Sequence, residues 1–151
     1  MSAVVVVSAC LVGLPTRYDG RSAASEEVFA AARDCTLVPV CPEQLGGLPT
    51  PRLPHFCQRG TGEDVVAGRS RVVTAEGGDA TAAFLRGAEL VARLTELCGA
   101  REVWLKEKSP SCGVRWTTVA GTSIPAPQTV AGPGVTAALL LSRGLRVRGF
   151  A

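Results

Sequence analysis

The stretch "VVVVSAC", residues 4–10, decides the fold that we predict for this chain. Its four consecutive valines are bounded by small residues, and a continuous β-branched run of this kind predicts a strand that is buried on both faces. Such strands belong to parallel sheets that carry helices on either side. Because Cys10 follows the valines so closely, a reactive side chain comes just after the carboxyl end of the strand.

Further strand patterns alternate with helical patterns along the chain. The strand patterns lie at residues 36–40, 71–74, 103–106 and, shorter and more exposed, 145–148. The helical patterns lie at residues 25–33, at residues 81–97 and in "VTAALLLS" ahead of Gly144. This alternation predicts right-handed βαβ units and a mostly parallel sheet. We therefore expect a single α/β domain over residues 1–151, three-layered and Rossmann-like.

The helix limits have their own signals, and two segments fit neither pattern. Ser25 precedes the first helix as an N-cap, and Pro133 and Gly144 flank the third. Residues 41–69 and 107–131 are rich in Gly and Pro and read as irregular. Loops of that length in a compact domain usually serve function.

Six cysteines could form three disulfides, but two observations favour free thiols. A chain of 151 residues can build a hydrophobic core without covalent cross-links. No positive residue precedes Val4, and the apolar run there is shorter than a secretory core. We therefore expect a reduced, cytoplasmic protein.

Position relative to the strands sorts the cysteines. In open α/β sheets, ligands bind outside the carboxyl ends of the strands. Three cysteines follow predicted strands at that edge: Cys10, Cys41 and Cys112. Cys35 and Cys98 fall at the opposite edge and are expected to pack as small hydrophobes, and Cys57 stays unassigned.

Three converging thiols in a chain with one histidine leave two chemistries open. Catalytic zinc takes three protein ligands, and an iron–sulfur cluster held by three thiolates keeps one iron without a protein ligand, which can act as a Lewis acid. A thiol nucleophile is equally compatible with the residues, and packing of the three cysteines as small hydrophobes is the remaining alternative. Because no C-x-x-C pair is present among the three, the pattern depends on its placement in the fold.

Polar residues beside these cysteines have a functional and a structural interpretation each. Glu43 is either a general base or acid with a raised pKa, or a solvated loop charge. Asp19 in "RYDG" either forms the turn or accepts a hydrogen bond from a polar ligand, aided by Arg17 and Tyr18.

The segment "KEKSPSCG", residues 106–113, holds the only two lysines among sixteen basic residues. Lys106 ends a strand at the active edge, where an ammonium group could stabilise a developing negative charge, with Glu107 as its expected neutralising partner. Ser109 and Ser111 either contact a ligand or shape the turn. "GPGVT" opens a helix and offers a weaker candidate for an anion site.

Charge and hydropathy exclude other classes of function. The net charge of +3 is spread as single arginines without a basic run, so no nucleic-acid surface is expected. No apolar run approaches the length of a membrane span. We expect a small-molecule partner and a monomer or small homo-oligomer.

Six motifs occur in order along nearly the whole chain. They are "SACLVG", "RYDG", "PVCPEQLGGLPTPR", "GDATAAFLRGAE", "LKEKSPSCG" and "GPGVTAALLLSRGL". Together they resemble the small bacterial thiouracil desulfidases, long described as a domain of unknown function.

The resemblance implies a [4Fe-4S] cluster held by Cys10, Cys41 and Cys112, with the fourth iron free to take the sulfur of a thiolated pyrimidine. It implies a non-redox reaction in which thiouracil and water give uracil and hydrogen sulfide, with Glu43 taking a proton from the attacking water. The remaining expected site residues are Lys106 and Ser109 as catalytic groups and Tyr18, Asp19 and Ser111 as substrate contacts.

The chain also departs from the family pattern. Many relatives carry a cysteine where this chain has Thr16, which favours three cysteine ligands. Residues 114–130 match the family poorly, so the substrate stays open among thiouracil, a thiolated nucleotide and another thioamide. Two other classes stay open: an enzyme with Cys112 as nucleophile and Lys106 or Glu43 as partner, and a non-catalytic metal or cluster carrier.

Overall fold

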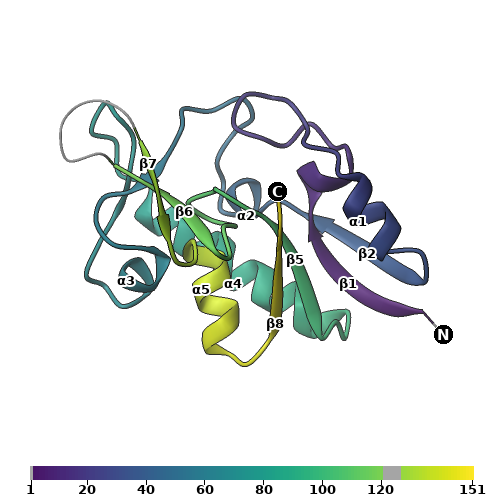
Figure 1. Cartoon of the computed structure of the whole chain (residues 1–151). Helices are drawn as coiled ribbons and strands as arrows, with labels where there is room; N and C mark the ends of the chain where they lie inside the picture. Colours follow the sequence, from purple (N-terminus) through teal and green to yellow (C-terminus); the bar gives the residue numbers. More distant parts are fainter. Residues whose placement is uncertain (1, 121–126) are drawn as a thin grey trace.

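A computed structural model describes residues 2–120 and 127–151, and a four-stranded parallel sheet lies at its centre (Figure 1). Its strands stand in the order β2-β1-β5-β8. They span Ala3–Ser8 (β1), Cys35–Val40 (β2), Glu102–Lys106 (β5) and Arg146–Phe150 (β8). The valine run thus forms an inner strand, as its uninterrupted apolar character predicts.

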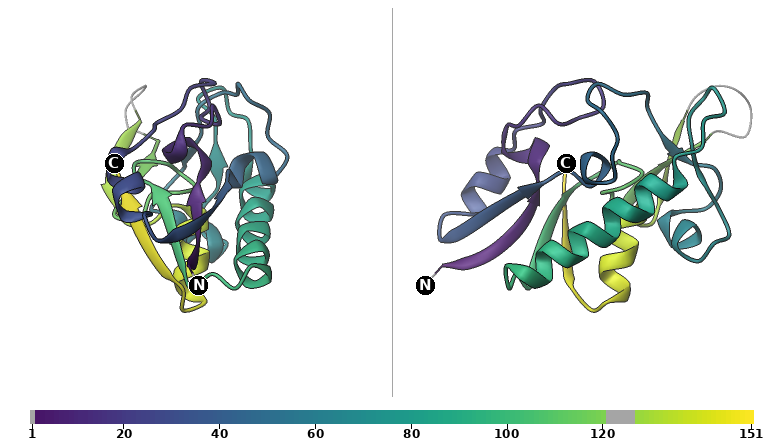
Figure 2. Two further views of the ribbon diagram at one scale, coloured as in Figure 1. Left: turned by 90° about the vertical axis from the view of Figure 1, so that its right-hand side faces the viewer. Right: turned by 180° about the vertical axis from the view of Figure 1, so that it is seen from behind.

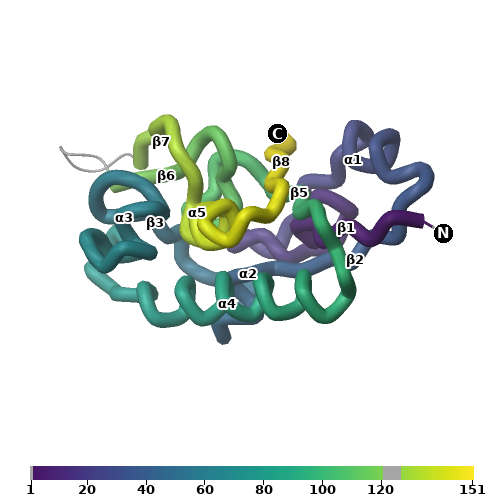
Figure 3. Tube along the Cα trace, turned by 90° about the horizontal axis from the view of Figure 1, so that it is seen from below, coloured from purple at the N-terminus to yellow at the C-terminus, as the bar shows by residue number. Residues whose placement is uncertain are grey.

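The side chains of β1 alternate between two hydrophobic clusters. Val6 packs with helices α4 (Thr81–Leu97) and α5 (Val135–Ser142) on one face of the sheet. Val5 and Val7 pack on the other face against the short helix η1 (Ala9–Val12) and against α1 (Glu26–Ala31). Figure 3 shows α4 on one side of the molecule and α1 on the opposite side. The three-layer α/β expectation is confirmed.

The order of the strands contains a switch point. From β1 the chain passes through α1 to β2 on one side, and from β5 it passes through α5 to β8 on the other. The direction of winding therefore changes between β1 and β5. Open α/β sheets bind ligands outside the carboxyl ends of the strands at such a switch point.

The expected helices are present with small shifts at their ends. The backbone N–H of Val28 donates to the Ser25 side chain (3.3 Å), which confirms Ser25 as the N-cap of α1. The limits of α4 agree with the sequence pattern, because its apolar positions recur at helical spacing through seventeen residues.

The expectation of two irregular segments is wrong in part, because both contribute to a second, mixed sheet of order β4-β3-β6-β7. Its strands are Phe56–Cys57 (β3), Val72–Val73 (β4), Trp116–Val119 (β6) and Gln128–Ala131 (β7). Two short helices, Pro42–Leu45 (α2) and Gly62–Val66 (α3), lie in the first of these segments. Strands of two to four residues are too short to show a period of two. Residues 121–126 of the second segment lie outside the described residues.

One hydrophobic cluster joins the two sheets. It contains Val6 and Val103 from the parallel sheet together with Cys57, Val72 and Val119 from the second sheet. Figure 2 shows α4 extending from one sheet to the other. The described residues therefore form a single compact body. Within residues 2–120 and 127–151, no helix has the length and apolarity that a membrane crossing requires.

Helix α2 is fixed against α4 through two glycines. A side chain at Gly46 would collide with the Ala83 carbonyl, and one at Gly87 would collide with the Pro42 carbonyl. The Arg86 guanidinium donates a hydrogen bond to the Gly46 carbonyl (2.7 Å) across the same contact. This close approach sets the position of α2 and thus of Glu43 within it.

The first prediction concerns this contact. Gly87→Ala should lower the free energy of unfolding by about 1–2 kcal/mol in urea titrations, because the clash outweighs the higher helix propensity of alanine. Arg93→Ala, on the exposed side of α4, is the matched control and should change it by less than about 0.5 kcal/mol. A Gly87→Ala protein as stable as wild type would contradict the tight contact.

Candidate active site

A cavity of about 320 Å³ opens at the carboxyl edge of the parallel sheet, at the switch point between β1 and β5. Cys10, Cys41 and Cys112 all line it. Cys10 follows β1 within η1, Cys41 precedes the first residue of α2 directly after β2, and Cys112 lies on the turn after β5. The three strand ends therefore bring together the three cysteines that the sequence places at this edge.

The other cysteines lie elsewhere. Cys35 and Cys98 are partly buried at the edges of the two hydrophobic clusters, and Cys57 is fully buried in the core between the sheets. Burial raises the pKa of Cys57 to about 12, so its thiol is inert at neutral pH. All six cysteines are free thiols.

Burial and neighbouring negative charge disfavour the ionisation of the three cavity thiols. Burial raises the pKa of each above its ordinary value. A negative charge on Cys41 raises the pKa of Cys10 further, and charges on Cys41 and Cys10 do the same for Cys112. A site of this kind holds three thiolates only when a bound cation offsets their repulsion and their desolvation.

The donor set fits a cluster better than a single ion. Among the described residues, no three His, Cys, Asp or Glu side chains are close enough together to hold one metal ion. The three cysteines nevertheless line one cavity. An iron–sulfur cluster is larger than a single ion, so the thiolates that hold it lie farther apart, and thiolates are the ligands that such clusters take.

Glu107 holds the turn that carries Cys112. Its buried carboxylate accepts hydrogen bonds from the backbone N–H groups of Val114 (2.7 Å), Arg115 (3.0 Å) and Trp116 (3.3 Å). The expectation that this carboxylate neutralises Lys106 is wrong, since the Lys106 ammonium donates to the main-chain carbonyl of Glu107 instead (3.1 Å).

Ser109 and Ser111 occupy different places around the same turn. The Ser109 hydroxyl oxygen accepts from the N–H groups of Ser111 (3.2 Å) and Cys112 (3.0 Å), and Ser109 lines the cavity. Ser111 does not line it, because its side chain is fully buried and its hydroxyl pairs with that of Thr136 (2.8 Å). Ser111 therefore stabilises the turn through α5 and does not contact the cavity.

The N-terminus of α5 closes the turn from the other side. The N–H groups of Val135 and Thr136 donate to the carbonyls of Pro110 (2.8 Å) and Ser111 (2.9 Å). Because Gly134 carries no side chain, the helix can approach these carbonyls closely. The N–H groups that a free anion would need are thus occupied, and "GPGVT" serves to position Cys112.

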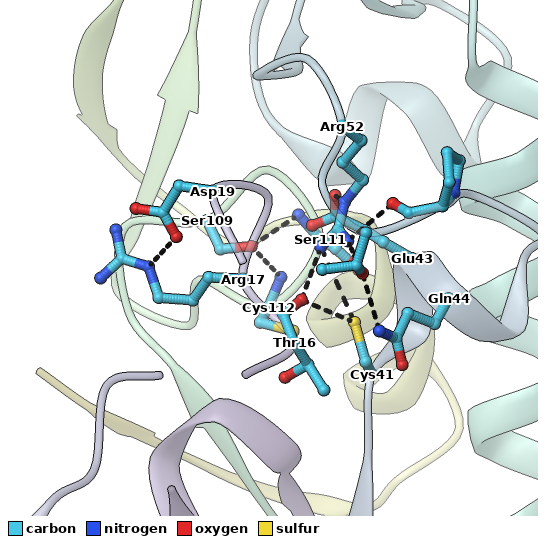
Figure 4. Close-up of polar contacts among 12 residues, drawn as sticks. Thr16, Arg17, Asp19, Cys41, Glu43, Gln44, Arg52, Ser109, Ser111 and Cys112 are labelled. Atoms are coloured by element: carbon cyan, nitrogen blue, oxygen red, sulfur yellow. Dashed lines mark hydrogen bonds and ion pairs between the residues drawn. The ribbon is translucent and has the colours of Figure 1, made fainter. Parts of the chain in front are cut away.

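Arg52 connects Glu43 to Cys41 (Figure 4). Its Nε donates to Oε1 of Glu43 (2.8 Å), and Nη2 contacts both the Thr16 carbonyl (3.0 Å) and the Cys41 sulfur (3.8 Å). Nη1 donates to Thr50 Oγ1 (2.9 Å). The side chain of Arg52 is only 4% exposed and that of Glu43 13% exposed. The ion pair is therefore shielded from water and well fixed.

The remaining expected residues separate into two groups. Lys106 and Tyr18 line the cavity, and burial lowers the pKa of Lys106. Asp19 does not line it: its carboxylate accepts from the N–H of Arg21 (3.0 Å) and lies 3.7 Å from the Arg17 guanidinium. Asp19 thus shapes the exposed turn that carries Arg17 and Tyr18.

Two cavity residues carry no clear sequence signal. Arg52 is the last residue of the motif "PVCPEQLGGLPTPR". The sequence around it does not indicate that its side chain contacts Glu43 and the Thr16 carbonyl. His55 also lines the cavity, and its only signal is that it is the single histidine of the chain.

Fold and site together define a class of protein: α/β chains with three cysteines, a carboxylate and a lysine around a cavity at the carboxyl edge of a parallel sheet. The model of the 2-thiouracil desulfurase family matches residues 5–149. The chain belongs to this family, and the expectation from its motifs is confirmed.

Two similar proteins have been described. An uncharacterized protein of Bacillus subtilis (strain 168), YbbK, is 42% identical over 147 residues, which cover 95% of this chain and 93% of the relative. The solved structure of the [4Fe-4S]-dependent thiouracil desulfidase TudS is 39% identical in sequence. Its TM-score is 0.77, with 98% of this chain and 91% of that chain covered.

The second prediction concerns the turn that carries Cys112. Glu107→Gln should lower the free energy of unfolding by about 1–3 kcal/mol, because a neutral amide oxygen accepts the three N–H groups at Oε1 more weakly than a carboxylate and the –NH₂ faces the Arg115 N–H that Oε2 accepts (3.2 Å). It should also speed the alkylation of Cys112 in metal-free protein, followed by mass spectrometry. Glu89→Gln, which breaks an exposed ion pair with Arg143, is the control. Equal alkylation rates in both variants would argue against the role of Glu107.

Proposed function

We propose that this chain is a [4Fe-4S]-dependent desulfidase that hydrolyses the carbon–sulfur bond of a thiolated pyrimidine, as the base or as its nucleotide. The observation that carries the proposal is the convergence of Cys10, Cys41 and Cys112 on one cavity with Glu43 beside them. Family membership and the likeness to TudS support it.

The three cysteines would hold the cluster as thiolates. When bound, the cluster would supply an iron without a protein ligand, and thus a Lewis acid toward the sulfur of the substrate. Cluster binding releases the thiol protons, which burial and mutual repulsion otherwise retain.

Glu43 would act as the general base. Arg52 holds its Oε1, so the carboxylate has a fixed orientation at the cavity wall and Oε2 can take a proton from water. The water oxygen then forms a bond to the ring carbon as the carbon–sulfur bond breaks. Thiouracil and water give uracil and hydrogen sulfide, so no electron donor or acceptor is needed.

Lys106, Ser109 and Tyr18 would bind the ring. The hydroxyl oxygen of Ser109 accepts two backbone N–H groups, and its hydrogen can therefore point to a ligand. The Lys106 ammonium can stabilise negative charge that develops on a pyrimidine oxygen. We assign Asp19 and Ser111 to the positioning of the loops that carry these groups.

The alternative with Cys112 as nucleophile is less well supported. A nucleophilic cysteine needs a lowered pKa and access to the substrate. Cys112 is 6% exposed, and burial raises its pKa. A non-catalytic carrier would not explain a carboxylate and an ammonium group that line the same cavity as the cysteines.

The deciding experiment is reconstitution without oxygen. Wild-type protein given iron and sulfide should turn brown, bind about four irons and release sulfide from 2-thiouracil. Cys112→Ser should lose most of the iron and the activity, whereas Cys98→Ser, remote from the cavity, should retain both. A wild-type protein that stays colourless and free of iron would exclude the proposal and direct attention to Cys112 as a nucleophile.

The catalytic base has a separate test. Glu43→Gln should retain the visible spectrum and iron content of wild type but release sulfide at least about 100-fold more slowly, because the amide cannot accept the proton of water. Glu96→Gln on the exposed surface of α4 is the control. A Glu43→Gln protein with full iron and unchanged kcat would assign the base to another residue.

A further inference from the structure

We infer that His55 is a specificity residue, whose Nε2–H donates a hydrogen bond to the carbonyl oxygen of the pyrimidine in the cavity. The inference rests on the proposed function and adds a residue to it. No motif or expected role includes this side chain.

His55 stands where the second sheet meets the cavity. It lies between Pro54 and Phe56, and all three residues line the cavity wall. Its ring packs at a tilt on Phe84 of α4, with 5.4 Å between the ring centroids, and the residue is only 9% exposed. The ring is therefore held in place before any ligand enters.

The two ring nitrogens of His55 differ in their surroundings. Nδ1 is the only buried side-chain nitrogen or oxygen without a hydrogen-bond partner in the part of the chain that the structure describes. Because Nδ1 is enclosed and the residue lines the cavity, we assign Nε2 as the ring nitrogen that can contact a molecule there; the backbone of Leu53 is a second polar group near the ring. A purely structural role is a poor explanation, because an apolar side chain would fill the same space without a buried unpaired nitrogen.

The surroundings also select the tautomer. A buried N–H without an acceptor is rarer in proteins than an acceptor without a donor, which favours a bare Nδ1 and a hydrogen on Nε2. Burial lowers the pKa of His55, which supports a neutral ring. The group presented to the cavity is thus a neutral donor.

A neutral donor at this wall suits the oxygen of a thiolated pyrimidine. Both 2-thiouracil and 4-thiouracil carry one carbonyl oxygen in addition to the sulfur, whereas pyrimidine-2-thione carries none. A buried donor that loses its partner discriminates against a ligand that lacks the acceptor. His55 should therefore favour oxygen-bearing substrates over the oxygen-free analogue.

The test compares His55→Phe and His55→Gln with wild type in the cluster-loaded enzyme. Phenylalanine retains the packing on Phe84 but has no donor, and glutamine restores an N–H donor. His55→Phe should retain iron content and visible spectrum, raise the KM for 2-thiouracil roughly tenfold and change kcat less. Its turnover of pyrimidine-2-thione should be equal to that of wild type or faster, because the donor that this analogue leaves unpaired is gone. His55→Gln should recover part of the lost affinity for 2-thiouracil.

A second readout does not depend on activity. Because His55 is the only histidine, protein labelled with ¹⁵N-histidine gives one pair of ring-nitrogen NMR signals. We expect the Nε2–H tautomer, and uracil should shift the Nε2 signal more than the Nδ1 signal.

The outcomes separate the two proposals. If the wild-type protein neither binds a cluster nor releases sulfide, the proposed function itself is contradicted. An active wild type with a His55→Phe variant of unchanged KM and substrate preference overturns the assignment of His55 alone. Loss of iron from His55→Phe would show that His55 supports the structure or binds the cluster. This result would overturn the assignment as a specificity residue, whether or not His55→Gln retains its iron.

Discussion

Strand β1 lies between β2 and β5 and runs parallel to both, and this pairing determines where every reactive group lies. Parallel strands end at the same edge of a sheet, so the segments that follow β1, β2 and β5 meet there. These segments carry Cys10, Cys41 and Cys112. The pairing in turn depends on the four valines, whose side chains pack into the hydrophobic clusters on both faces of the sheet.

Two buried charged groups convert this edge into a defined site. The Glu107 carboxylate accepts hydrogen bonds from three backbone N–H groups in the turn after Cys112. The Arg52 guanidinium donates to Glu43, to the Thr16 carbonyl and to the Cys41 sulfur. Hydrogen bonds to charged groups are stronger than those between neutral groups, and low exposure protects them from competition by water. Flexible loops would not hold three sulfurs and a carboxylate in place without such ties.

Most of the parallel sheet could be predicted, and so could the convergence of three cysteines. Of the second sheet, the sequence indicates only β4, through the pattern at residues 71–74. Strand β3 has only two residues and pairs with segments distant in the chain, so the sheet itself leaves no readable pattern. Glu107 shows the same limit. Its neighbour Lys106 suggested a local ion pair, yet the carboxylate satisfies backbone donors up to nine residues away. Ser111 and Asp19 share the motifs of the cavity residues but turn to partners outside the cavity.

The sequence by itself determined the α/β class, the limits of the long helix, the cysteines of the active edge and the family, because these depend on local periodicity and on motif order. Only the tertiary structure decided that Arg52 meets Thr16, 36 residues before it, and that His55 stands in the cavity with an unpaired Nδ1. Such contacts join residues far apart in the chain. Their energies depend on burial and on geometry in three dimensions, so they leave no regular pattern in the order of the amino acids.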